Sequence, residues 1–390
     1  MAEFKIGIIG IGTMGGAHAD ALFAGKLAGA ALGAVCDTNP QKIADAKAKF
    51  GDKVEYYSDD DEFIRNAKVD AVIVATPHYF HPPLAIKVLQ SGRHVLSEKP
   101  AGVYTKQVKE LIAVAEKSDK MYAIMYNQRT SPLYKKVKEL YESGELGELK
   151  RVNWIITNWY RAQSYYDSGA WRATWEGEGG GVLLNQCPHN LDLWQWMVGM
   201  PKRMRAFMRY GVNRDIEVEN DVTAYAEYAN GATALFVTST HEAPGTNRLE
   251  ISGSMGKLVV EDDKLTFWRN RMPEEEFNKI YKGGFGSPEC WKCEIPVKGD
   301  YPKHLGVLKM WMEACKTGDK SKMIARGEEG INCVKLFNAM HLSAWTDSWV
   351  DIDTMDEDLF KKLLDEKIAN SPHTGKTGQS ITLNPGETYQ

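Results

Sequence analysis

Cysteine is scarce and scattered in this chain of 390 residues. Its six cysteines are too few and too dispersed for a disulfide framework, so we expect reduced thiols in a cytoplasmic protein. Cys290 and Cys293 form one C-x-x-C, but no second pair and no histidines at ligand spacing accompany it, so we expect no metal site. No apolar stretch is long enough to span a bilayer, and the N-terminal run lacks the pattern of a signal peptide.

An excess of positive charge is also missing. Lysine and arginine number 48 against 52 acidic residues, which gives a formal net charge of -4. We therefore expect neither a nucleic-acid partner nor an anionic membrane surface. Apolar residues make up 43% of a chain that is longer than one typical domain. This composition predicts two domains, each with its own hydrophobic core.

Residues 1–125 alternate short apolar runs with helical stretches. Continuous apolar strands separated by helices predict a parallel sheet covered on both faces, which is a Rossmann-type α/β domain. The expected strands are 4–9, 31–36, 54–57, 71–75, 94–97 and 122–125, and the expected helices are 14–26, 40–49, 59–66, 80–90 and 105–117.

The pattern changes in residues 126–352. After an expected helix near 132–142, most of the expected strands alternate in polarity, and Gly or Asn-Gly turns separate them. This predicts an open, mostly antiparallel sheet, and helices near 303–317 and 328–346 complete a second, α+β domain. Residues 353–390 form a polar tail, for which we expect a short helix and then an extended end.

A G-x-G-x-x-G motif at residues 10–15 follows the first expected strand and opens a helix. In that context Gly10 permits a tight turn, Gly12 lets the backbone approach a pyrophosphate, and Gly15 lets helix and strand pack closely. Thr13 and Met14 would present free N–H groups at the helix N-terminus. A glycine-rich turn in an unrelated α/β protein is the alternative.

Asp37 ends the second expected strand, where dinucleotide-binding proteins place an acid. Its carboxylate would accept hydrogen bonds from the adenosine ribose and repel a 2′-phosphate. No arginine follows among residues 38–40, so we expect NAD as the cofactor and consider NADP less favoured. Asp37 is equally suited to cap the helix that begins at Pro40, and the two roles are compatible.

The fourth expected strand ends beside the same crevice. The residues that follow it, Thr76, Pro77, His78 and His81, are therefore candidate cofactor contacts. For His81 alone, a structural histidine with satisfied ring nitrogens is the favoured alternative.

Glu98-Lys99-Pro100 follows the fifth expected strand. Removal of a hydride from a carbinol carbon needs a nicotinamide ring, a proton acceptor, and positive charge for the developing oxyanion. The Lys99 ammonium suits the last role, and with its pKa lowered by burial it can share the second. A solvent-exposed lysine paired with Glu98 is the alternative.

These segments, together with Gly179-Gly180-Gly181 and the run from Val182 to Asp192, resemble the Gfo/Idh/MocA oxidoreductases over roughly residues 4–350. The resemblance implies NAD(P)-dependent redox chemistry on cyclic polyols, sugars or their derivatives. It also implies a homodimer or homotetramer joined through the open face of the second sheet.

By this resemblance Glu98 meets the nicotinamide ribose, Lys99 meets the reacting oxygen, and His189 is the acid/base. It also implies contacts at the nicotinamide end of the cofactor from Asn127, Trp171 and Arg172. A capped or core histidine at a helix start is the alternative for His189.

Two positions depart from the family pattern. His78 stands where an asparagine is usual, and Asn185 stands where an aspartate commonly precedes the histidine by four residues. Asparagine carries no charge and accepts no proton, so the proton transfer would fall to His189 and Lys99. Asp192 either orients the imidazole or makes a helix-surface or interdomain contact.

The segment 159–175 is rich in aromatic residues and arginine. Aromatic faces pack against the C–H faces of sugars, and arginines donate to hydroxyls. A hydrophobic plug or a subunit contact is equally compatible. The substrate contacts that we expect are Lys99, Arg129, Trp159, Arg161, Tyr165, Arg172, Asn185 and His189.

Three functions fit these residues. The preferred hypothesis is an NAD-dependent oxidoreductase that acts on a secondary hydroxyl of a sugar, inositol or glycoside. A second retains its NAD, as a glycoside 3-oxidoreductase or an oxidation–elimination glycosidase. A third is a non-catalytic NAD-bound sensor, which Lys99 and His189 disfavour because a pure binder needs no proton donor.

Overall fold

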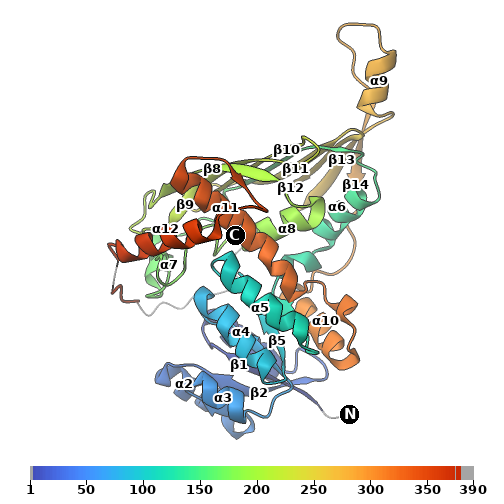
Figure 1. Ribbon diagram of the computed structural model, residues 1–390. Coiled ribbons are helices and arrows are strands. Elements are labelled where there is room, and N and C mark those ends of the chain that lie inside the picture. Colours follow the sequence, from blue (N-terminus) through green and yellow to red (C-terminus); the bar gives the residue numbers. More distant parts are fainter. Residues whose placement is uncertain (1–2, 374, 379–390) are drawn as a thin grey trace.

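The computed structural model describes residues 3–373 and 375–378. A parallel sheet and its helices form the lower part of the molecule in Figure 1, and a larger, mostly antiparallel sheet lies above it. The fold class predicted from the sequence is therefore confirmed.

The first sheet has six parallel strands in the order β3-β2-β1-β4-β5-β6. Strand β4 is buried along its whole length because helices cover both faces, which explains the absence of polar alternation. The strands are β1 (Phe4–Ile9), β2 (Ala30–Cys36), β3 (Glu55–Tyr57), β4 (Ala71–Val74), β5 (His94–Ser97) and β6 (Tyr122–Ile124). The helices are α1 (Thr13–Phe23), α2 (Pro40–Phe50), α3 (Asp60–Asn66), α4 (His81–Gln90) and α5 (Thr105–Lys117).

The second sheet has nine strands in the order β14-β13-β12-β11-β7-β10-β9-β8-β15. The β7–β10 pair is parallel, and the other pairs are antiparallel. The strands are β7 (Leu149–Ile156), β8 (Arg203–Tyr210), β9 (Glu219–Glu227), β10 (Thr233–Ser239), β11 (Asn247–Gly253), β12 (Gly256–Glu261), β13 (Lys264–Asn270), β14 (Cys290–Ile295) and β15 (Val350–Asp351).

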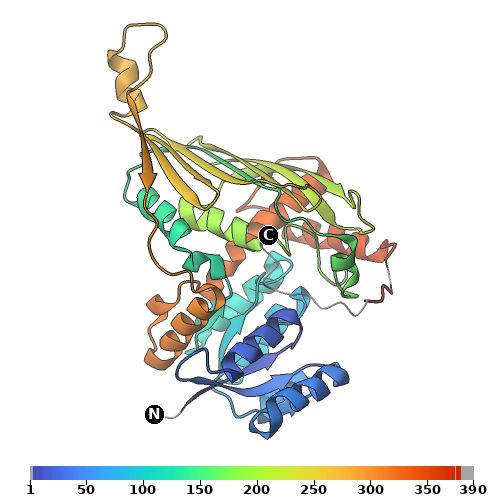
Figure 2. The same cartoon turned by 180° about the vertical axis from the view of Figure 1, so that it is seen from behind.

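Helices cover one face of this sheet. Figures 1 and 2 show α6 (Pro132–Glu142), α8 (Pro188–Val198) and α11 (Gly330–Thr346) between the sheet and the first domain. Within the described part of the chain, no helix lies on the opposite face. The core beneath the sheet continues into the first domain through Val108 of α5 and Ile124 of β6, so the two domains share buried surface.

We expected the chain to pass from the first domain to the second once, near residue 125. Instead, a later helix returns to the first domain. Helix α10 (Lys303–Thr317) lies within the expected second domain, yet Val307, Leu308 and Trp311 pack with Ile6 and Ile8 in the core of the first. The amphipathic pattern of α10 predicts a helix but does not say which sheet the helix covers.

The tail is more firmly packed than expected. Helix α12 (Glu357–Ala369) buries Phe360 and Leu364 against the second domain. Lys376 then donates to the main-chain oxygens of Tyr166 and Arg172, at 2.9 and 3.1 Å. The rest of the expected extended end, residues 379–390, lies outside the described residues.

The segment from 271 to 295 forms an arm that projects from one end of the sheet (Figures 1 and 2). It carries α9 (Glu274–Ile280) and ends in β14, neither of which was predicted. Cys290 and Cys293 both lie on β14, where a spacing of three directs side chains to opposite faces. Such a pair does not suit a shared metal ion. The remaining short helix is α7 (Gln163–Asp167).

Candidate active site

The carboxyl ends of the parallel strands meet below the second domain, and the glycine motif follows the central strand β1. Gly10 has φ +89°, and a Cβ there would lie 2.7 Å from the main-chain oxygen of Ala75. A Cβ on Gly15 would lie 1.8 Å from the oxygen of Gly10. Both positions therefore require glycine, for the reasons that the motif predicted.

Gly12 is different, because a Cβ there would meet no described atom within 4 Å. The space above this loop adjoins the start of α1, which begins with Thr13 and Met14. Among residues 3–373 and 375–378, no side chain caps this helix N-terminus. Free N–H groups beside an open, glycine-lined space suit the pyrophosphate of a dinucleotide.

Asp37 lies at the end of β2, beside the glycine motif. Its carboxylate accepts from the main-chain N–H groups of Ile11 (3.0 Å) and Asn39 (2.9 Å). Lys42 Nζ lies 3.1 Å from the same carboxylate, a contact that we did not predict. Asp37 is thus fixed at the crevice, in place to accept hydrogen bonds from a ribose.

Several buried polar atoms near these strand ends have no hydrogen-bond partner in the described part of the chain. They are Thr76 Oγ1, both amide atoms of Asn127, and His189 Nδ1. Buried polar groups are normally hydrogen-bonded, so unpartnered atoms on the segments after β4 and β6 and at the start of α8 leave hydrogen-bonding groups for a polar ligand. The residues present therefore fit NAD, with Thr76 and Asn127 as candidate contacts.

The two histidines after β4 have different environments. His81 places its ring nitrogens 2.8 Å from the oxygen of Pro100 and 2.7 Å from that of Thr76. The ring is 1% exposed and its N–H donates to a main-chain carbonyl, so the expected cofactor contact from His81 is wrong and the structural alternative holds. His78 is buried against Trp171 and lies 3.1 Å from the main-chain oxygen of Glu178. Burial, His81 and Lys99 keep the pKa of His78 well below its usual value.

Glu98 is buried and hydrogen-bonded to His18 on α1, at 2.8 Å. Burial alone would raise the pKa of this carboxyl, but His18, His304 and Lys99 outweigh it and lower the pKa to about 2. Glu98 therefore stays charged beside Lys99. His18 was not predicted, because a histidine within a helix is more often a core residue.

Lys99 joins the two domains. Its Nζ donates to the main-chain oxygen of Asn185 at 2.6 Å, across the interface between β5 and the loop before α8. Burial lowers the pKa of this ammonium, the charges of Glu98 and Glu178 raise it, and those of Arg172 and Arg161 lower it. An ammonium with a lowered pKa is able to donate to an oxyanion and to exchange a proton.

His189 lies at the start of α8 and is 6% exposed. Burial and the charge of Lys99 keep the pKa of this imidazole well below 6.5, so the ring is neutral near pH 7. A neutral imidazole is able to accept a proton. The charge of Lys99 therefore acts on His189, and a shared catalytic role for the two groups stays a prediction.

Tyr165 lies between two arginines above Asn185. The guanidinium carbons of Arg161 and Arg172 lie 5.2 and 4.6 Å from its ring centre. Its hydroxyl accepts from Arg172 (2.9 Å) and donates to the Asn185 side chain (3.2 Å). Trp171 stacks on the other side of Arg172 at 4.8 Å. The expected loop residues are therefore brought together at the site.

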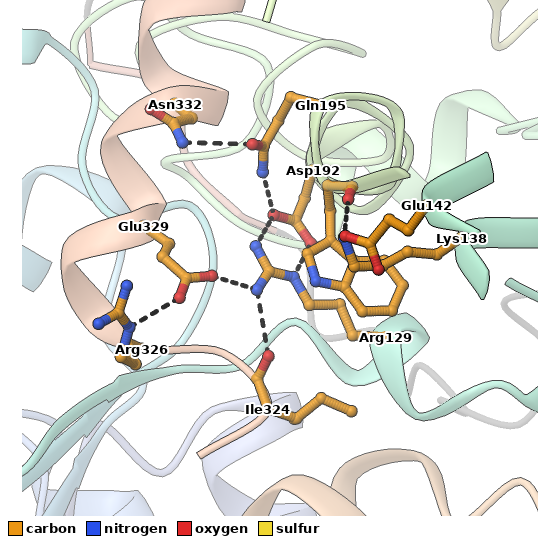
Figure 3. Close-up of polar contacts among 10 residues, drawn as sticks. Arg129, Lys138, Glu142, Asp192, Gln195, Ile324, Arg326, Glu329 and Asn332 are labelled. Carbon is orange, nitrogen blue, oxygen red and sulfur yellow. Dashed lines mark hydrogen bonds and ion pairs between the residues drawn. The ribbon is translucent and has the colours of Figure 1, made fainter. Parts of the chain in front are cut away.

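Two expected substrate contacts are wrong. Arg129 is 1% exposed, and its guanidinium is bound by Asp192 through two hydrogen bonds of 2.8 and 2.7 Å. It also donates to Glu329 and to the oxygen of Ile324 (Figure 3). The network in Figure 3 joins η3 (Asn127–Thr130), α8 and the segment before α11, so it holds the fold and keeps the guanidinium buried away from a sugar.

The same network accounts for Asp192, which pairs with Arg129 and not with the His189 imidazole. Trp159, the second wrong contact, belongs to the core of the second domain. Its indole N–H donates to Asn190 at 3.3 Å. Its position in an aromatic-rich segment did not distinguish a core residue from a surface that binds sugar.

Glu178 is the most important residue that the sequence analysis missed. It is 2% exposed, it precedes the glycine triplet, and its carboxylate accepts from the side chain of Asn185 and from the N–H of Ala173. The sequence did contain a hint of it. Asparagine at position 185 carries no charge, so the Lys99 ammonium needs a carboxylate from another position.

None of the helices in the described residues combines the length and the apolar composition of a membrane span. The same residues contain no group of three His, Cys, Asp or Glu side chains placed to hold a metal ion.

Comparison with known proteins matches both domains. Residues 4–126 match the profile of the oxidoreductase family with an NAD-binding Rossmann fold, and residues 134–259 match the GFO/IDH/MocA C-terminal domain. Levoglucosan dehydrogenase from Pseudarthrobacter phenanthrenivorans is 23% identical over 395 residues, which cover 90% of this chain and 99% of that protein. Myo-inositol 2-dehydrogenase from Thermotoga maritima is 27% identical over 267 residues, covering 67% and 76%.

Among solved structures, the WlbA dehydrogenase from Bordetella pertussis in complex with NADH and UDP-GlcNAcA has a TM-score of 0.75. It is 25% identical, and the match covers 90% of this chain and 98% of that one. Levoglucosan dehydrogenase in complex with NADH and levoglucosan has a TM-score of 0.74 at 20% identity, covering 90% and 99%.

We predict that Asp37→Ser weakens NAD binding about ten-fold and narrows the preference for NAD over NADP, because a charge-assisted hydrogen bond contributes roughly 1.5–3 kcal/mol. Titration of nicotinamide fluorescence with NADH and NADPH measures both affinities. Asp45→Ser, an exposed acid on α2, is the matched control. Equal NADH affinity in the Asp37 variant and the control would contradict the assignment.

Proposed function

Since this chain belongs to the Gfo/Idh/MocA family of oxidoreductases and has its NAD-binding Rossmann domain, we propose that Lys99 and His189 catalyse oxidation of a secondary hydroxyl. The substrate class that we propose is a sugar, inositol or glycoside. The observation that supports the proposal is the 2.6 Å hydrogen bond from Lys99 Nζ to the main-chain oxygen of Asn185, which brings the ammonium to the segment that leads into the buried, neutral imidazole of His189.

NAD, when bound, supplies the acceptor for the hydride. The side chains stabilise the developing charge and transfer the proton. Lys99 donates to the substrate oxygen and stabilises the negative charge that develops on it. His189, neutral because burial lowers its pKa, takes the hydroxyl proton as general base. In the reverse direction, the protonated imidazole returns the proton to a keto-sugar.

The substrate class is supported by the residues around Tyr165. Two arginines donate to hydroxyls, and the tyrosine and tryptophan faces suit the C–H faces of a sugar ring. Relatives named for levoglucosan and myo-inositol are consistent with this class. A panel of polyols, free sugars and glycosides tests it, with NADH absorbance as the readout. A panel that gives no NADH and no bond cleavage, with tight NAD binding, would contradict catalysis.

We also propose a homo-oligomer joined through the bare face of the second sheet. Ile155, Phe207, Tyr225 and Trp268 are exposed large side chains on four strands of that sheet. Contiguous exposed apolar groups are typical of interaction surfaces.

We predict a dimer or tetramer by light scattering, and dissociation of that assembly in Phe207→Asp. A monomeric wild-type protein would contradict the proposal.

We predict that Lys99→Met lowers kcat by about 10³-fold or more, because loss of one oxyanion donor typically costs 10²–10³ and proton exchange is also lost. Affinity for NAD should change little. Steady-state kinetics and NADH titration measure the two effects. Lys106→Met, an exposed lysine on α5, is the control. Unchanged turnover in the Lys99 variant would reject its role.

The pH dependence of kcat/KM for alcohol oxidation gives a separate prediction. Burial lowers the pKa of His189, so the imidazole becomes protonated, and unable to accept a proton, only at a pH below its ordinary 6.5. The acidic limb of the profile should therefore lie below pH 6.5 and disappear in His189→Asn. An acidic limb at or above pH 6.5 would be inconsistent with this assignment.

A further inference from the structure

Glu178 is a buried carboxylate with an unusual environment. Among the described residues, no lysine or arginine nitrogen lies within ion-pair distance of it, although it is 2% exposed. A buried carboxylate is costly unless it is hydrogen-bonded and compensated by positive charge. Its two hydrogen bonds come from Asn185 and from the N–H of Ala173, at 2.6 Å for the latter.

The positive charges that act on Glu178 lie beyond ion-pair distance. Burial raises the pKa of this carboxyl, while Arg172, the two hydrogen-bond donors and Lys99 oppose that rise. The influence is mutual, because the Glu178 charge also raises the pKa of Lys99. Glu178 and Lys99 therefore compensate each other across the site, without direct contact.

Asn185 connects the two groups. Its main-chain oxygen accepts from Lys99 Nζ at 2.6 Å, and its side-chain amide donates to Glu178. The amide oxygen accepts from the Tyr165 hydroxyl, which in turn accepts from Arg172. Removal of the Glu178 carboxylate would free the side-chain amide of Asn185. It would also leave the charges of Arg161 and Arg172 acting on the Lys99 ammonium, with one carboxylate fewer to oppose them.

We propose that Glu178 is a positioning residue: it fixes Asn185 and supplies the negative charge that holds the Lys99 ammonium at the reacting hydroxyl. This role rests on the function proposed above. The carboxylate stands seven residues before Asn185, on a different segment of the loop, and it provides the charge that asparagine at 185 lacks.

The ionisable groups that act on Lys99, or on which Lys99 acts, come from every element around it. They are Glu98 after β5, Arg161, Arg172 and Glu178 of the aromatic loop, His78 and His81 before and at the start of α4, Cys187 and His189 at α8, His304 on α10 and Cys333 on α11. Of these, Glu98 and Glu178 are the carboxylates, so loss of either should lower the pKa of Lys99.

The test measures the protonation of Lys99 without any substrate. Trace acetylation with acetic anhydride over a pH series, read by mass spectrometry of the peptide with Lys99, reports the unprotonated fraction of the amine. We expect Glu178→Gln to lower the pKa of Lys99 by about one unit, a typical effect of one nearby charge, so that labelling at a fixed lower pH rises about ten-fold. Glu176→Gln, an exposed acid on the same loop, should leave labelling unchanged.

Two further variants separate charge from structure. Glu178→Asp retains the charge, and Asn185→Asp combined with Glu178→Gln moves the carboxylate to position 185. Both should return Lys99 labelling toward the wild-type rate. Labelling in Glu178→Gln that equals wild type, or a double variant that labels as fast as Glu178→Gln, would overturn the proposal.

NADH titration of each variant confirms that the first domain is intact. In Glu178→Gln, the limb of the kcat/KM profile that reports deprotonation of Lys99 should move to lower pH, because the pKa of Lys99 is lower in this variant. Because labelling needs no turnover, a wrong substrate class leaves the labelling result unaffected. Failure of the proposed function and failure of the Glu178 assignment are therefore distinguishable.

Discussion

The site depends on one interaction between domains, the hydrogen bond from the Lys99 ammonium to the main-chain oxygen of Asn185. It links the end of a parallel strand to the loop that leads into α8. A half-buried ammonium needs compensating negative charge, and the carboxylates of Glu98 and Glu178 contribute to it.

The same enclosure determines which groups carry charge. Glu98 stays ionised because the hydrogen bond from His18 and the charge of Lys99 help to outweigh the effect of burial on its pKa. His78 and His189 stay neutral because burial and the nearby ammonium both disfavour a second positive charge. Alcohol oxidation requires a positive group for the developing oxyanion and an acceptor for the proton, and the proposed roles of Lys99 and His189 match these two requirements.

Local patterns predicted much of this arrangement. The apolar runs give all six parallel strands, and strand ends in a Rossmann domain are where Asp37, Thr76 and Lys99 are expected. Long-range pairing was not predictable in the same way. The sequence around Arg129 does not tell whether its side chain binds a sugar or pairs with a buried carboxylate. The packing of α8 brings Asp192 to Arg129 and so decides between the two. Glu178 was missed because its partner, Asn185, is brought to it by the fold of the loop.

The most direct test of the central claim is a crystal structure of the complex with NAD and a substrate, or with an unreactive analogue of it. We predict that one hydroxyl of the ligand lies within hydrogen-bond distance of both Lys99 Nζ and a ring nitrogen of His189, beside the cofactor. A ligand bound with its hydroxyls away from either group, or a structure in which Lys99 points out of the crevice, would contradict it.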